Sequence, residues 1–322
     1  MVRAPSASNT PHTDLLSHLG WRTLMAVGVV IVLAVVAISL VPEIRGSWRN
    51  VSHPNGRWLA IALGAFGCTF VFSALNYRVL AKHKLKVHRI ILVLLAGSFA
   101  NRLLPIGSGA ISVMYLFLRK QRHSVAEAGA VIAMNNGLGI IGHIVLLTGI
   151  TALYKIPSKY STVNFNVKVV IATSIVICIA IALIWFKRIR RQVFRVIRSI
   201  FKQLGTYRAH PLRLLSACMF ALAVTVGYTI CLIASARAVG AHMSPWAGFL
   251  VLTSGLFTAT LIPLPGGLGA TEAGLFTALV VLVGVSPPLA LATVVVYRLI
   301  TYWLPAIVGA ITLDITAARG YI

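Results

Sequence analysis

Acidic residues are scarce in this chain. Its 322 residues include five aspartates and glutamates against 29 lysines and arginines, which gives a formal net charge of +24. In a soluble protein that balance would suggest nucleic-acid binding. Here 58% of the residues are hydrophobic, and the basic residues lie between long apolar runs. That pattern is typical of cytoplasmic loops beside anionic head groups, so we predict a polytopic membrane protein with no nucleic-acid partner.

Cysteine and recognisable catalytic motifs are also lacking. The four cysteines lie within apolar runs and none has a CxxC spacing, so neither a disulfide framework nor a metal site is predicted. No glycine-rich stretch continues into the Gly-Lys-Ser/Thr of a Walker loop, and no Ser/His/Asp arrangement indicates hydrolysis. We therefore expect no cofactor and no catalytic residue, and transport is favoured over enzyme activity.

Long apolar runs define the architecture. A membrane-spanning helix needs about 20 apolar residues. Two further apolar stretches are interrupted, 88–118 by NRLLPIGSG and 246–285 by PLPGGLG. Residues 1–20 are polar and predict a disordered tail, whereas 21–315 form a single transmembrane domain. The six uninterrupted runs cover 21–42, 57–80, 124–153, 167–186, 212–235 and 287–311.

The basic segments predict the orientation of these runs. Segment 187–211 is strongly basic, contains no acid and reads as an amphipathic helix on the cytoplasmic surface. Segments 78–89 and 119–122 are also basic and should be cytoplasmic. A single crossing by 88–118 would place them on opposite sides, whereas a re-entrant hairpin keeps both inside. Its tip would contain Pro105, Gly107 and Gly109.

The second interrupted stretch has the same pattern. A hairpin with Pro263 and Pro265 at its tip would enter from the opposite side, which is typical of an inverted repeat. The fold class is then an all-α integral membrane protein with about six transmembrane helices and two re-entrant helical hairpins. Both termini would be cytoplasmic and the location the plasma (inner) membrane. Eight simple spans are the alternative, and they leave one basic segment on the outer side.

Motifs in both interrupted stretches resemble those of one family. The sequence PLPGGLGATEAGLF and the residues after it resemble the C-terminal signature of the flippase-like membrane domain of lysylphosphatidylglycerol synthase. NRLLPIGSGA resembles the first motif of that family, with Gly-Ser-Gly where Gly-Gly is commoner. The resemblance covers roughly 20–315 and does not extend to the aminoacyl-transfer domain, so it implies lipid translocation rather than lipid aminoacylation. The matching positions are Pro263, Pro265, Gly266, Gly267, Gly269, Glu272, Gly284, Val285, Arg298, Thr301, Tyr302, Trp303 and Pro305.

Three charged residues at membrane depth are the strongest site candidates. An ionised carboxylate there is costly without a partner or a water-filled cavity. We expect Glu272 to pair with Arg298, near the middle of the last span. The pair either holds the second hairpin in place, or Glu272 carries a proton or recognises a head group. Arg102 has no acid nearby in sequence, so it either binds an anion or points to a backbone carbonyl or water.

Glycines and asparagines complete the set of candidate residues. Gly266, Gly267 and Gly269 let the chain turn and approach a ligand without a Cβ, and the following helix directs its N-terminal amides toward it. These residues, with Arg102 and Arg298, would bind a lipid head group. Asn135 and Asn136 are secondary polar candidates, best explained as hydrogen-bonding partners between helices.

Together these features predict that the protein moves an anionic amphipathic lipid between leaflets. The lipid would be a phospholipid or a polyprenyl-phosphate-linked intermediate. One alternative is a membrane-embedded glycosyltransferase or lipid-modifying enzyme. It is less favoured because Glu127 and Glu272 are the only acids in the middle of the chain. Another alternative is a non-catalytic membrane partner of an enzyme of lipid or cell-envelope synthesis.

Overall fold

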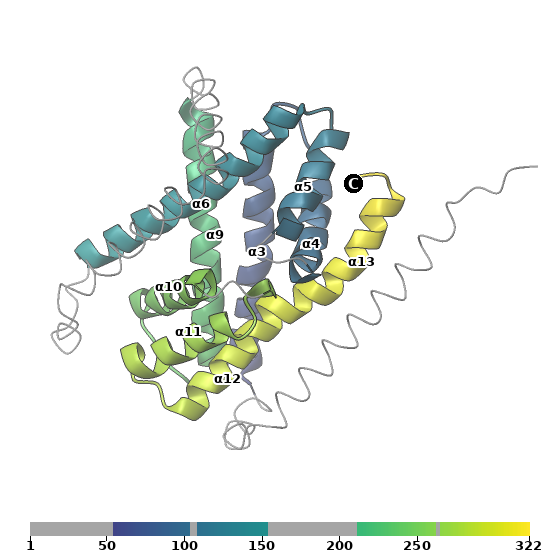
Figure 1. Cartoon of the computed structure of the whole chain (residues 1–322). Coiled ribbons are helices and arrows are strands. Elements are labelled where there is room, and N and C mark those ends of the chain that lie inside the picture. The colour runs from purple at the N-terminus through teal and green to yellow at the C-terminus, as the bar shows by residue number, and fades with distance from the viewer. Residues whose placement is uncertain (1–53, 104–107, 154–210, 262–264) are drawn as a thin grey trace, which may run out of the picture.

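The computed structural model describes residues 54–103, 108–153, 211–261 and 265–322, and this part of the chain is helical with no strand. The all-α prediction is therefore confirmed for these residues (Figure 1). The elements are α3 (Gly56–Leu80), α4 (Val87–Leu103), α5 (Ser108–Lys120), α6 (Val125–Leu153), α9 (Pro211–Ala238), α10 (Pro245–Leu261), η3 (Pro265–Gly267), α11 (Ala270–Ala278), η4 (Leu279–Val283), α12 (Pro287–Arg298), η5 (Leu299–Trp303) and α13 (Leu304–Ala318).

Four helices in the described residues are long and apolar enough to cross a membrane: Gly56–Leu80, Val125–Gly149, Pro211–Ala238 and Pro287–Ala318. They match four of the six predicted spans. The last helix continues beyond the predicted end at 311. The other predicted spans, 21–42 and 167–186, and the segments 1–20 and 187–211 lie outside the described residues, except for Pro211, which begins α9.

Helices α3 and α9 form the central antiparallel pair (Figure 1). The amide of Asn55, which caps the start of α3, donates to the carbonyl of Ala238 at the end of α9 over 2.8 Å. Gly227 lets the helices approach closely, because a Cβ there would lie 2.7 Å from Thr69 Cγ2 and 3.2 Å from the carbonyl oxygen of Ala65. Such small residues are the usual means by which membrane helices come into contact.

Helices α4 and α5 form a hairpin, as predicted for 88–118. Their arms touch where Gly109 in the first turn of α5 lies against the backbone of Ala100. The flanks of the hairpin also meet, because Lys82 Nζ lies 2.9 Å from Glu127 Oε1 and the rings of His83 and His123 are 4.9 Å apart. A single crossing would separate these residues by the thickness of a membrane. The structure thus shows a helical hairpin whose two ends lie close together, and its re-entry into the membrane stays a prediction.

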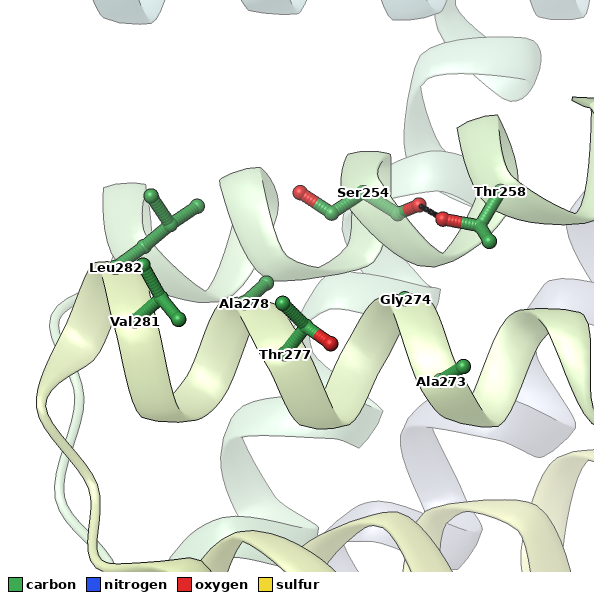
Figure 2. A pocket seen from close by; sticks show the side chains of 8 residues that line it. All are labelled: Ser254, Thr258, Ala273, Gly274, Thr277, Ala278, Val281 and Leu282. Carbon is green, nitrogen blue, oxygen red and sulfur yellow. Dashed lines mark hydrogen bonds between the residues drawn. The ribbon is translucent and has the colours of Figure 1, made fainter. Parts of the chain in front are cut away.

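Helices α10 and α11 form the second hairpin, again with close helix contacts at glycines. Gly274 lies against Thr258, and a Cβ on Gly255 would lie 2.8 Å from Leu275 Cγ. A shallow groove of about 320 Å³ runs between the two arms (Figure 2). Its lining is mostly apolar, and the hydroxyl of Thr258 donates to the backbone carbonyl of Ser254 over 2.8 Å. None of the residues that line the groove is charged, so it has no charged group with which to bind an anion.

The described elements follow the same order in the two halves of the chain. In each half, one long helix (α3 or α9) precedes a hairpin, and a second long helix (α6 or α12–α13) follows it. Since α3 and α9 are antiparallel, the first described helices of the two halves run in opposite directions, which fits the predicted inverted repeat. Helix α13 packs along α4, where Gly309 contacts Leu95 and Phe99. The depth to which either hairpin enters a bilayer stays a prediction.

Candidate functional site

The aromatic ring of Tyr302 joins the two arginines that the sequence analysis selected separately. The guanidinium carbons of Arg102 and of Arg298 each lie 4.3 Å from the centroid of this ring. Arg102 comes from α4 of the first hairpin, whereas Arg298 ends α12 and Tyr302 lies in η5. Guanidinium groups are attracted to the face of an aromatic ring, and the attraction strengthens away from water. The buried ring therefore holds two cations from distant segments beside each other.

Local helix geometry explains how Arg298 reaches Tyr302. Residues four apart lie on the same side of a helix. The segment between α12 and α13 has π-helical hydrogen bonds over Leu299–Trp303, and single-turn π segments often occur at functional sites. Trp303 precedes Leu304, where the α-helical pattern resumes. The wider turn thus falls within the part of the last helix that supplies the Tyr302 ring.

Arg102 is held mainly by backbone carbonyl groups. Its Nη1 donates to the carbonyl oxygen of Ser98 one turn earlier, and its Nη2 donates to the carbonyl oxygen of Tyr302. This is the carbonyl contact that the sequence analysis weighed against anion binding. Of the three guanidinium nitrogens, Nε is the one that is buried without a hydrogen-bond partner among the described residues. The guanidinium is thus positioned by the protein, and its Nε–H has no partner in the described structure.

Glu272 and Arg298 form the ion pair expected from the sequence, with 2.6 Å between Glu272 Oε1 and Arg298 Nε. Glu272 lies in the first turn of α11, where the helix dipole favours a negative charge. The Arg298 side chain is 11% exposed and that of Glu272 is 29% exposed. Arg298 Nη2 and Glu272 Oε2 are buried without a partner in the described part of the chain. The pair therefore has unused hydrogen-bonding capacity on both sides, and the role of Glu272 as a proton carrier stays a prediction.

The glycine-rich break of the second hairpin contacts the same tyrosine. Gly266, Gly267 and Gly269 have φ values of +62°, +66° and +80°, which residues with a Cβ rarely adopt. A Cβ on Gly266 would lie 2.6 Å from the Tyr302 hydroxyl oxygen. The tip can therefore reach Tyr302 only because position 266 has no side chain. Both hairpins and the last long helix meet at this ring.

The other predicted residues lie elsewhere or outside the described residues. Asn135 accepts a hydrogen bond from Asn76 of α3 over 3.1 Å and donates to Asn136 over 3.4 Å, so its contacts include the helix–helix type expected. Gly109 lies in an arm of the first hairpin, and Pro265 begins η3. Three predicted tip residues, Pro105, Gly107 and Pro263, are not among the described residues.

Tyr302 is the residue that the sequence analysis left out of the candidate site. It was noted only as one position of the family signature. A usable signal was present, because an aromatic residue four positions after a membrane-embedded arginine can stack on it within one helix. The contact with Arg102 had no such signal, since 200 residues separate it from Tyr302.

Comparison with known families identifies the family of this chain. The sequence matches the family described as Lysylphosphatidylglycerol synthase TM region over residues 25–309. The chain belongs to this family. It matches no curated protein. Membership and the four membrane-crossing helices make it a multi-pass membrane protein of a family associated with lipid handling.

Proposed function

We propose that this family member moves an anionic amphipathic lipid between the two leaflets of the plasma (inner) membrane. The phosphate of the head group would bind beside Tyr302, and the acyl chains would stay in the bilayer. The observation that supports this most is the convergence of Arg102 and Arg298 on one ring at the tip of a hairpin. Arginine recognises phosphate through several charge-assisted hydrogen bonds.

The polar groups at the tip fit the same ligand. Backbone amides at a helix N-terminus favour an anion, and α11 begins at Ala270, directly after the glycine-rich break. The first intrahelical bond from Ala273 runs to Gly269, so the amides of residues 270–272 precede the regular pattern. A phosphate at this end of α11 would lie close to the ion pair of Glu272 with Arg298. The arginines and the helix terminus would thus bind the phosphate at one surface, without a hydrolysable cofactor. A partner enzyme that makes or uses the lipid would act beside the protein.

Replacing Arg102 with glutamine should slow lipid movement by about tenfold or more, because a hydrogen bond to a charged group contributes about 1.5–3 kcal/mol. The purified protein would be reconstituted in vesicles that contain a phospholipid labelled on its acyl chain, and the label reaching the outer leaflet would be measured over time. Arg89→Gln is the matched control, because Arg89 also lies in α4 and stacks on an aromatic ring, that of Tyr321 at 4.9 Å.

The same vesicles test the alternative functions. Lipid movement that depends on Arg102 and not on Arg89 supports the proposal. Equal rates in both variants would remove Arg102 from the mechanism. A modified lipid that forms without movement between leaflets would instead indicate an enzyme.

The proposed orientation can be tested with single cysteines in a variant that lacks the native ones. Lys84→Cys and Arg122→Cys flank the first hairpin at exposed positions, and both should react with an impermeant thiol reagent only from the cytoplasmic side. His242→Cys lies between α9 and α10 at an exposed position and should react only from the outside. Reaction of the first two cysteines from opposite sides would contradict the re-entrant hairpin.

A further inference from the structure

The charges around Tyr302 do not balance. The charged side chains at this ring are Arg102 and Arg298, which stack on it, and Glu272, which pairs with Arg298. Two are positive and one is negative, so this cluster carries one net positive charge. The two tip segments next to it in sequence, 104–107 and 262–264, contain no ionisable residue. Among the described residues, the cluster therefore has a single uncompensated positive charge.

The unpaired donors lie on the two guanidinium groups that carry this charge. Arg102 Nε and Arg298 Nη2 are both buried without a hydrogen-bond partner in the described structure. Their guanidinium carbons lie at equal distances of 4.3 Å from one ring centroid, so they are separated by no more than twice that distance. A phosphate group has several acceptor oxygens, so a phosphate at the edge of this ring would accept from both arginines.

The charge of the ligand then decides how costly the bound state is. A net charge at membrane depth is expensive unless it is paired. A phosphodiester carries one negative charge and would make the cluster neutral. A phosphomonoester carries about 1.5–2 negative charges at pH 7, with a second pKa of about 6. A monoester or a diphosphate would therefore leave excess negative charge in the protein.

We propose that the site selects lipids whose head group is attached through a phosphodiester, and that it discriminates against lipids ending in a phosphomonoester or a diphosphate. This inference rests on the function proposed above and specifies its substrate class. Glu272 sets the selectivity, because its carboxylate cancels one of the two guanidinium charges. The arginines bind the phosphate, and the glutamate limits how much negative charge the site accepts.

The unaltered protein provides the first test. Phosphatidylglycerol and phosphatidic acid, each labelled on an acyl chain, would be compared in the same vesicles at about pH 5 and about pH 8.5, on either side of the second phosphate pKa of about 6. At the higher pH, we expect phosphatidylglycerol to move about tenfold faster than phosphatidic acid. This ratio of rates corresponds to about 1.4 kcal/mol. The ratio should fall toward one at the lower pH, where phosphatidic acid also carries a single charge.

The outcomes of this test separate the inference from the proposed function. The phosphodiester does not titrate in this range, so its rate reports any effect of pH on the protein itself. A ratio that does not change with pH, or faster movement of phosphatidic acid at the higher pH, would overturn the inference and leave lipid movement intact. If neither lipid moves, the proposed function fails, and the inference fails with it.

Substitutions at Glu272 provide the second test. Glu272→Gln leaves both arginine charges uncancelled, so the preference at the higher pH should shift by about tenfold toward phosphatidic acid. Glu272→Asp is the matched control, because its shorter side chain also weakens the contact to Arg298 but keeps the negative charge. It should retain the preference for the phosphodiester. The same lipid preference in both variants would overturn the role of Glu272. If the glutamine variant does not fold, the ratio of phosphatidylglycerol to phosphatidic acid movement in the unaltered protein decides the inference.

Discussion

Glu272→Gln is expected to lower the free energy of unfolding by about 3 kcal/mol. Removing one member of a buried ion pair leaves the other charge without compensation, which costs about 3–5 kcal/mol. We take the lower end of this range because the Glu272 side chain is 29% exposed, although that of Arg298 is only 11% exposed. Unfolding of the purified protein in detergent by a chemical denaturant would measure the loss.

A double variant distinguishes the ion pair from two independent contributions. Arg298→Met removes the charge that Glu272→Gln leaves unpaired, so the double variant should recover part of the lost stability. Glu127→Gln is the control. Glu127 pairs with Lys82 at 2.9 Å, but those side chains are 33% and 70% exposed, so solvent screens the pair and it contributes little to stability. Strictly additive losses for Glu272→Gln and Arg298→Met would contradict their coupling.

The control at Glu127 is specific because glutamine preserves its other role. Glu127 accepts a hydrogen bond from the amide of Ser124 over 2.9 Å, and the Ser124 hydroxyl accepts one from the amide of Glu127 over 3.2 Å. This reciprocal pair is a capping box at the start of α6, and glutamine can replace glutamate in it. The substitution therefore removes the surface charge while the helix cap is kept.

Much of the fold could be predicted because its elements depend on local sequence properties. Apolar length predicted the four described spans, and the proline- and glycine-rich breaks predicted both hairpins. The basic flanks around 88–118 predicted that the first hairpin returns to the side from which it starts. Charge scarcity predicted the contact of Glu272 with Arg298, because an intramembrane carboxylate needs a partner and few are available.

The site itself depends on contacts that no local pattern encodes. Arg102 and Tyr302 are 200 residues apart, and they meet only because α13 packs along α4. The π-helical turn of η5 also lacked a signal, since the sequence around it reads as an ordinary apolar span. The sequence therefore identified the charged residues of the site and missed the aromatic ring that brings them together.

Gly266→Ala is expected to reduce lipid movement by about tenfold or more while the protein still inserts into the membrane. The added Cβ would lie 2.6 Å from the Tyr302 hydroxyl oxygen and 2.9 Å from Cε2 of its ring, so the ring or the hairpin tip must move. Because both arginines stack on this ring, its displacement changes the position of both guanidinium groups that we propose bind the phosphate. Transport in vesicles at matched protein levels would measure the effect.

Gly284→Ala separates this contact from backbone strain. Gly266 and Gly284 both have positive φ values, +62° and +77°, so alanine at either position carries a similar conformational cost of about 1–2 kcal/mol. A Cβ on Gly284, however, would meet no atom within 4 Å. Gly284→Ala should therefore lose some stability and keep lipid movement, whereas Gly266→Ala should lose lipid movement as well. If both variants move lipid equally well, the contact between the hairpin tip and Tyr302 serves helix packing, and the phosphate must bind elsewhere.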